Sequence, residues 1–107
     1  MTAVIGRRIT MSCRTTLTTP VDWYYLPLDD ERFRLIYSAG NIISNYSHRM
    51  TLDISVPGDF SLTIVNVTRE DAGVYVCRED AGLGLEHRVY LNVQGKINVP
   101  KCPKYFL

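Results

Sequence analysis

The sequence has almost no net charge and no long apolar run. Its 107 residues carry 12 basic and 11 acidic side chains, which leaves a net charge of +1. A surface for nucleic acid or for anionic membranes needs clustered basic side chains, so neither partner is expected. No apolar run approaches the ~18 residues of a transmembrane helix, and we expect no membrane span. The length suits one domain with one core.

Patterns for catalysis and metal binding are also missing. The chain has two histidines, His48 and His87, and no Gly-x-Ser-x-Gly motif, so a nucleophile with its base and orienting group is not indicated. A structural zinc site needs about four closely spaced ligands, and Cys102 offers only one between lysine and proline residues. No glycine-rich phosphate loop opens a helix. We therefore expect no enzyme, no metal and no cofactor.

What the chain does contain is a set of four residues in a fixed order, Cys13, Trp23, Tyr75 and Cys77. Two cysteines with a tryptophan between them, and a tyrosine two positions before the second cysteine, resemble the signature of the immunoglobulin sandwich. The resemblance implies an all-β fold of two antiparallel sheets in a Greek key. It implies a Cys13–Cys77 disulfide with Trp23 beside it in the core. It also implies that the Tyr75 hydroxyl bonds to the main chain at the corner Asp71-Ala72-Gly73.

Alternation of apolar and polar residues predicts strands along most of the chain. The expected strands cover residues 4–13, 21–26, 32–37, 42–43, 48–54, 60–67, 74–78 and 86–93. The side chains expected to face the core include Ile9, Met11, Val21, Tyr25, Met50, Leu52, Ile54, Phe60, Leu62, Ile64, Val89, Leu91 and Val93. Few residues precede Cys13, so we expect the outermost first strand to be absent or trimmed.

Strands at 32–37 and 42–43 favour the variable-type sandwich over the constant type. Residues 1–94 thus resemble the V-set domains of cell-surface and antigen receptors, and residues 33–41 look like the segment before the second hypervariable loop of antibody light chains. Residues 81–84 have the glycines of a receptor joining segment but not its aromatic residue. This departure favours a germline-encoded domain, similar to those of innate receptors, adhesion molecules or the V-type receptors of invertebrate chordates.

The two ends of the chain carry separate expectations. Met1 to Arg8 is too short and too soon charged for a signal peptide, so we expect that the signal was removed or left out. Residues 95–107, with two prolines and no alternation, are expected to form a stalk, a linker or an added tail. Cys102 should lie outside the core and should not pair with Cys13 or Cys77; its expected partner is a cysteine of another chain or one elsewhere in the protein. Disulfide-bonded cysteines indicate an extracellular domain, at the cell surface or secreted.

Four further residues are candidates for an ion pair and for modification. Arg49 and Asp71 stand where V-set domains commonly close one end of the sandwich with an ion pair; the alternative is two solvated charges. Asn45-Tyr46-Ser47 and Asn66-Val67-Thr68 match the acceptor motif for N-glycosylation. Such motifs also arise by chance, so the alternative for Asn45 and Asn66 is an unmodified surface residue.

A binding face is expected on the sheet that contains the Trp23 strand and the last two strands. The residues expected to point outward there are Tyr24, Leu26, Arg34, Tyr37, Val76, Arg78, Leu83, Leu85 and Tyr90. Clustered tyrosine, arginine and aliphatic side chains are typical of interface cores. The sequence therefore predicts an extracellular receptor domain that binds a protein ligand or a second immunoglobulin domain through this face. The alternatives are a homophilic adhesion domain that forms a homodimer, a structural module of a multidomain array, and a face covered by a first strand or another domain.

Overall fold

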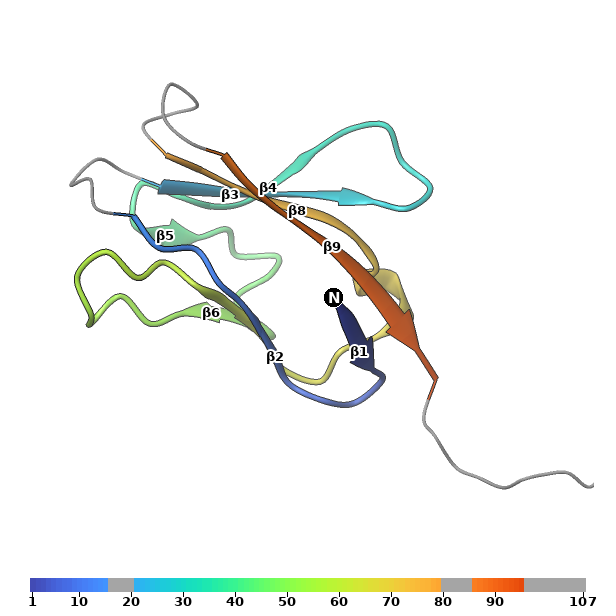
Figure 1. The fold of residues 1–107 in the computed structure, drawn as a ribbon. Helices are drawn as coiled ribbons and strands as arrows, with labels where there is room; N and C mark the ends of the chain where they lie inside the picture. Colours follow the sequence, from blue (N-terminus) through green and yellow to red (C-terminus); the bar gives the residue numbers. More distant parts are fainter. Residues whose placement is uncertain (16–20, 80–85, 96–107) are drawn as a thin grey trace, which may run out of the picture.

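Two sheets face each other across the disulfide in the computed structural model, which describes residues 1–15, 21–79 and 86–95 (Figure 1). One sheet has six strands in the order β1-β9-β8-β3-β4-β5, and the other has three in the order β2-β7-β6. The elements are β1 (Thr2–Val4), β2 (Ile9–Met11), β3 (Val21–Pro27), β4 (Arg34–Ser38), β5 (Asn41–Ile42), β6 (Met50–Leu52), β7 (Leu62–Ile64), the short 3₁₀ turn η1 (Arg69–Asp71), β8 (Gly73–Glu79) and β9 (Glu86–Gln94). The chain thus folds as the predicted variable-type sandwich.

The core forms where the apolar sides of the two sheets meet. The Cys13–Cys77 disulfide joins the three-stranded sheet's side to β8, as predicted. Trp23 is fully buried next to it, and its indole Nε1 donates to the carbonyl of Phe60 at 2.7 Å. Burying one large apolar side chain stabilises a fold by roughly 2 to 3 kcal/mol. Closing a loop of this length with a disulfide adds roughly 4 kcal/mol on the chain-entropy account.

Period-two alternation predicts the core side of most strands correctly. Val21, Trp23 and Tyr25 of β3 are buried, and Asp22 and Tyr24 on its other side are only partly so. One prediction of this kind is wrong. Ile54 is 53% exposed because β6 ends at Leu52. The apolar–polar alternation of the sequence continues past the end of the strand, where it no longer determines which side chains face the core.

The start of the chain also differs from the prediction of a missing first strand. β1 is a strand, and it pairs in parallel with β9, Thr2 opposite Asn92 and Val4 opposite Gln94 (Figure 1). Ala3 between them is 3% exposed and belongs to the core. Gly6, at φ 88°, then allows the chain to turn toward β2 in the opposite sheet. Within the described part of the chain, no strand pairs with the other edge of β2.

A register shift between β3 and β4 changes which side chains face the core. Trp23 lies opposite Tyr37, but the next pair is Tyr24 opposite Leu35, so Ile36 is an extra residue in β4. Such a bulge sends two successive side chains to the same side. Ile36 and Tyr37 are accordingly 0% and 4% exposed. The prediction that Tyr37 lies on the outward face is therefore wrong.

Arg34 is misplaced by the prediction for the same reason. It lies opposite Tyr25, whose side chain faces inward, so Arg34 is on the inner side at the end of β4. There it pairs with Asp30 of the β3–β4 hairpin, with 2.7 Å between Nη2 and Oδ2. Arg34 thus belongs to one end of the sandwich, and the outward face lacks it.

Two expectations fall on residues that the structure does not describe. Residues 96–107, including Cys102, lie outside the described part, and so do Leu83 and Leu85. Among the residues that are described, no helix is long and apolar enough to cross a membrane.

Candidate protein-binding face

The outward side of the six-stranded sheet, here called the outer face, is built from rows of paired residues. β3, β8 and β9 align Asp22 with Arg78 and Glu86, Tyr24 with Val76 and Arg88, and Leu26 with Val74 and Tyr90. Leu35 of β4 extends the Tyr24 row. Residues directly opposite each other point to the same side of a sheet, so these side chains form one continuous surface.

Arg78 contacts two aromatic rings on this surface. Its guanidinium lies 4.9 Å from the ring centre of Tyr24 and 5.8 Å from that of Phe33. A cation over an aromatic face is attracted by the ring quadrupole, typically by about 0.5 to 1 kcal/mol at exposed sites. The Arg78 side chain therefore lies over the two rings.

Glu86 lies between two arginines on the same surface. Arg88 Nε donates to Glu86 Oε2 at 2.5 Å, and Arg78 Nε lies 3.4 Å from Glu86 Oε1. The hydrogen bond from Arg88 lowers the pKa of the Glu86 carboxyl below its ordinary value of 4.5, and the charges of both arginines act in the same direction. Arg78 Nε is buried and makes no hydrogen bond to the described residues. Two guanidinium groups thus share one carboxylate on this surface.

The apolar part of the outer face differs from the predicted one. Val76 points outward, but it is 0% exposed because neighbouring side chains cover it, so the prediction that it contacts a partner is wrong. Tyr90 is 64% and Phe33 38% exposed, and Tyr24, Leu26, Leu35 and Val74 are half-buried. Sequence reasoning missed Phe33 as a member. Its signal was present in the alternation with Leu35, once the extra residue in β4 is known.

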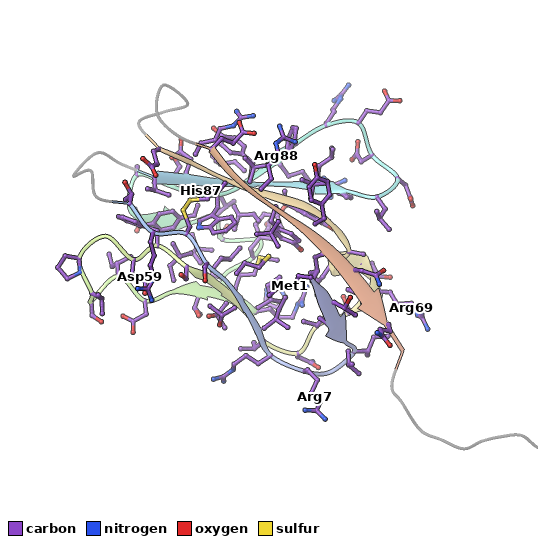
Figure 2. The ribbon with its side chains drawn as sticks, in the orientation of Figure 1. Met1, Arg7, Asp59, Arg69, His87 and Arg88 are labelled. Carbon is purple, nitrogen blue, oxygen red and sulfur yellow. A yellow bond between two sulfur atoms is a disulfide. The ribbon has the colours of Figure 1, made fainter. Side chains whose placement is uncertain are left out.

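β9 supplies polar side chains to both sides of its sheet (Figure 2). His87 points inward near the disulfide, and Arg88 points outward. His87 Nε2 lies 3.1 Å from Oε2 of Glu79, a carboxylate whose side chain is 2% exposed. Burying a carboxylate without a partner costs folding free energy, and the contact with His87 reduces this cost for Glu79 at the end of β8. It is a structural pair and lies away from the outer face.

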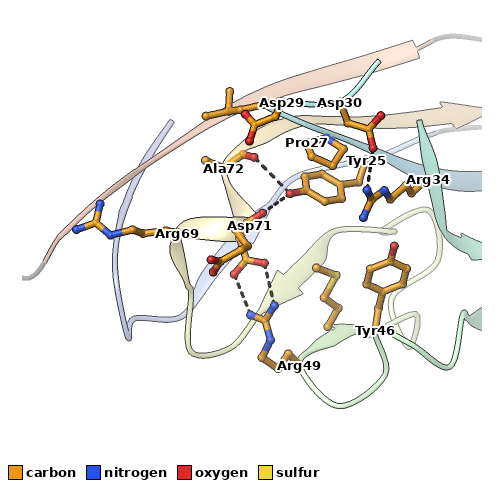
Figure 3. Close-up of a pocket in the computed structure, with 13 residues that line it drawn as sticks. Tyr25, Pro27, Asp29, Asp30, Arg34, Tyr46, Arg49, Arg69, Asp71 and Ala72 are labelled. Atoms are coloured by element: carbon orange, nitrogen blue, oxygen red, sulfur yellow. Dashed lines mark hydrogen bonds and ion pairs between the residues drawn. The ribbon is translucent and has the colours of Figure 1, made fainter. Parts of the chain in front are cut away.

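The opposite end of the sandwich is closed by Arg49 and Asp71 (Figure 3). Arg49 Nη1 and Nη2 donate to Asp71 Oδ2 and Oδ1 at 2.8 and 2.9 Å, a two-pronged contact. The Thr68 amide also donates to Oδ2, and the Tyr75 hydroxyl donates to the Asp71 carbonyl at 2.6 Å. Burial raises the pKa of the Asp71 carboxyl, but the bonds from Arg49 and Thr68 outweigh it and the net shift is downward. These contacts fix the corner that leads into β8.

The two candidate glycosylation residues lie near this closed end. Asn45 is exposed in the turn before β6, and Asn66 is exposed after β7 with a positive φ of 56°. The Asn66 carbonyl accepts from Arg49 Nη1 at 3.3 Å, so its side chain is free of that contact. No group of three or more metal-ligating side chains gathers among the described residues.

Comparison with known proteins fits this geometry. Residues 1–94 match the immunoglobulin V-set domain family, and the chain belongs to it. Over 94 residues the chain is 36% identical to the zebrafish (Danio rerio) V-set and immunoglobulin domain-containing protein 10, covering 87% of this chain and 16% of that protein. Over 82 residues it is 30% identical to the rabbit (Oryctolagus cuniculus) Ig kappa chain V region 3368, covering 75% of this chain and 73% of that one. The chain thus spans only a small part of the first of these relatives.

Solved structures with the same fold include two homodimers and one domain of a receptor. The extracellular domain of the voltage-gated sodium channel β4 subunit, a parallel homodimer, has a TM-score of 0.71 at 19% identity, with 91% of each chain covered. The first Ig domain of ZIG-8, also a homodimer, has a TM-score of 0.73 at 16% identity, covering 90% of this chain and 78% of that one. The first Ig domain of the mouse polymeric immunoglobulin receptor has a TM-score of 0.72 at 23% identity, with 92% of each chain covered. At these identities the likeness shows the fold alone.

Proposed function

We propose that this chain is the recognition domain of an extracellular protein, at the cell surface or secreted, and that it binds a protein ligand through the outer face. The observation that carries the proposal is the Tyr24–Arg78–Phe33 stack with Tyr90, Leu26 and Val74 around it on one side of the sheet. Aromatic and arginine side chains are the residues that dominate binding energy in protein interfaces. Neighbouring apolar side chains on a soluble domain commonly mark such a contact.

The positions of the two glycosylation motifs support this choice of face. Asn66 follows β7 and Asn45 precedes β6, and both strands belong to the three-stranded sheet. Glycans on these two residues would cover that sheet's end of the molecule and leave the outer face free. The disulfide between Cys13 and Cys77 supports an oxidising, extracellular location.

Homophilic adhesion is the second candidate. It is favoured by two proteins of the same fold, the sodium channel β4 subunit and ZIG-8, whose domains are homodimers. A twofold contact would place the same outer face of two copies together. Sedimentation over a wide concentration range separates the candidates: a domain that stays monomeric supports a different protein as ligand, and a concentration-dependent dimer supports adhesion.

The experiment compares variants on the outer face with control variants on the three-stranded sheet. A multivalent form of the domain is tested against single extracellular proteins displayed on cells, with Tyr90→Ala, Leu26→Ser and Tyr24→Ala as outer-face variants. Each should weaken association at least about tenfold, because an anchor side chain can be worth about 2 kcal/mol. Each should change stability by only about 1 kcal/mol or less, since none is fully buried.

Ser61→Ala and Thr63→Ala, which change the outward side of the three-stranded sheet, are the controls and should bind like the parent. If the control variants lose binding and the outer-face variants keep it, the binding site lies on the three-stranded sheet and the proposal fails.

A further inference from the structure

β2 is an edge strand of the three-stranded sheet, and β7 lies along one side of it (Figure 1). Among the residues that the structure describes, no strand pairs with its other side. β2 contains neither the lysine nor the proline with which many proteins block an open sheet edge. An open edge presents unpaired N–H and C=O groups to other strands. We call residues 8–12 along this open side the β2 edge.

The hydrogen bonds to β7 show which main-chain groups the β2 edge presents. The Cys13 carbonyl accepts from the amide of Phe60 at 2.8 Å, and β2 continues in the same register with β7. The direction of these bonds alternates along an antiparallel strand, so every second residue turns its main-chain groups toward β7. The residues between them turn their N–H and C=O groups to the open side, and they are Arg8, Thr10 and Ser12.

These residues are accessible to another strand. All three side chains are exposed, and none of the three amides or carbonyls bonds to the main chain of a described residue. Each of the three residues therefore has one main-chain donor and one main-chain acceptor to offer to a partner strand.

From this arrangement we infer that the β2 edge binds the β2 edge of a second copy of this chain, antiparallel and around a twofold axis at Thr10. A twofold contact of this kind brings the same residues of both copies together. Thr10 lies opposite Thr10 of the second copy, and Arg8 lies opposite Ser12 of the second copy. The open donors and acceptors of the β2 edge are then all paired.

Charge favours Thr10 as the centre of the contact. With this centre, Arg8 faces the neutral Ser12 of the second copy. A twofold axis at Met11 would instead place Arg8 opposite Arg14 of the second copy. Like charges directly opposite each other in a sheet are destabilising, so this register is disfavoured.

Main-chain bonding disfavours the register on the other side. A twofold axis at Ile9 would place Ser12 opposite Gly6 of the second copy. The Gly6 amide already donates to the carbonyl of Val67 at 2.8 Å, so Ser12 would find no donor there. The register centred on Thr10 leaves no such group unpaired.

The side chains on both sides of the sheet also fit this contact. On the outward side, Thr10 Oγ1 lies 2.8 Å from Thr63 Oγ1, and Thr51 of β6 lies opposite Thr63. The second copy extends this row with its own threonines, and threonine pairs stabilise neighbouring strands. On the inner side, Ile9 is only partly buried at the rim of the core. Met11 of the second copy lies opposite it and continues the apolar side.

This contact leaves the outer face of each copy free, so it goes beyond the proposed function. In a sheet that continues from one copy to the next, the twofold axis is perpendicular to the sheet. The six-stranded sheets of the two copies then lie on the same side of the joined sheet. Both outer faces point in the same direction, which would raise the avidity for a ligand that is repeated on a surface.

The test begins with sedimentation equilibrium of the whole chain from about 1 μM to about 1 mM, a range chosen because a contact this short belongs to the weak class of interfaces. The expected result is a dimer that forms as the concentration rises. Amide hydrogen exchange at both ends of the range locates the contact. The amides of Thr10 and Ser12 should gain protection in the dimer, whereas that of Met11, which faces β7, should be protected at both concentrations.

Ser12→Arg places a second positive charge opposite Arg8 and should weaken dimerisation about tenfold, because the twofold axis repeats the like-charge pair. The double variant Arg8→Glu/Ser12→Arg makes the opposed charges opposite in sign and should restore the dimer. Thr51→Arg is the matched control, since it adds the same charge to an exposed residue of the same sheet, at β6. It should dimerise like the parent. Melting temperatures show that each variant remains folded.

Tyr90→Ala separates this contact from homophilic adhesion through the outer face, because it should leave the β2 dimer intact. The inference is overturned if the parent stays monomeric up to about 1 mM, or if the amides of Thr10 and Ser12 gain no protection. It is also overturned if Ser12→Arg dimerises like Thr51→Arg, or if the double variant does not recover. Ligand binding by the outer face is measured separately, so either proposal can fail without the other.

Discussion

Trp23 and Tyr37 lie directly opposite each other across β3 and β4, and both side chains are inside the core. The next pair along, Tyr24 and Leu35, is on the outer face because the register shifts by one residue between the two pairs. Because of one extra residue in β4, Tyr37 packs in the core, whereas Tyr24 of β3 lies on the outer face opposite Leu35.

Replacing Tyr37 by alanine should therefore destabilise the domain by about 3 kcal/mol or more, since it opens a cavity beside Trp23. Tyr90→Ala is the matched control, with the same chemical change at a side chain that is 64% exposed. It should cost about 0.5 kcal/mol or less. Urea unfolding near neutral pH measures both, and equal losses for the two variants would contradict the burial of Tyr37.

The Arg49–Asp71 pair gives a prediction for stability near neutral pH. Arg49→Met should cost about 3 kcal/mol, because it leaves the Asp71 carboxylate, which is 3% exposed, without its main partner. Arg14→Met is the control, since Arg14 is an exposed arginine whose contact with Asp59 is 3.8 Å long. A loss for Arg49→Met no larger than that for Arg14→Met would show that the closed end does not depend on the pair.

Acid should remove the same stabilisation in the parent protein. The pKa of Asp71 is lower in the folded state than its ordinary value of 3.8. The stabilisation is therefore fully present above about pH 4 to 5 and is lost as the pH falls below 3.8 through the folded-state pKa. Unfolding free energies of the parent should drop over this range, and those of Arg49→Met should drop less. Parallel curves for the two proteins would contradict the assignment.

Alkali should act through two stacked tyrosines. Tyr25 and Tyr75 have ring centres 4.6 Å apart, and burial raises both pKa values, that of Tyr25 to about 12. A raised tyrosine pKa means stability that is fully present below pH 10 and is lost as the pH rises toward 12 and above. Absorbance of tyrosinate should show a late class that ionises together with unfolding. Tyr90→Phe, at a ring that is 64% exposed, should leave this late class unchanged, and its loss in that variant would contradict the prediction.

Gly73 begins β8 where only glycine fits. Its φ is 151°, and a side-chain carbon there would lie 2.2 Å from the carbonyl oxygen of Leu26 in β3. Gly73→Ala should therefore destabilise the domain by roughly 3 kcal/mol or more, because the obstacle is backbone and cannot rotate away. Gly40→Ala is the control, with φ 84° but open space around it, and should cost only about 1 kcal/mol. Thermal unfolding checks the pair, and similar losses for the two variants would contradict the clash.

Local periodicity and the Cys13–Trp23–Tyr75–Cys77 register were enough to predict the fold, because both record which side chains must meet between two sheets. They could not show the bulge at Ile36, since an extra residue is determined by pairing with β3 and not by β4 alone. They could not show the parallel pairing of β1 with β9 either, because the two strands are at opposite ends of the sequence. For the outer face, the sequence predicted the direction of most side chains but not their exposure. Alternation places Val76 outward, but only the packed neighbours show that it is covered.

The parallel pairing of β1 with β9 also has a mechanical consequence. Thr2 lies beside Asn92 and Val4 beside Gln94, so the chain enters β1 at one end of the pair and leaves β9 at the other. A force that pulls residue 1 and residue 95 apart slides the two strands past each other along their length. Their hydrogen bonds, with those from the amides of Ile5 and Asn92 at the two ends, then carry the load together and do not open one after another. The domain should resist stretching along this axis more strongly than its thermal stability alone would indicate.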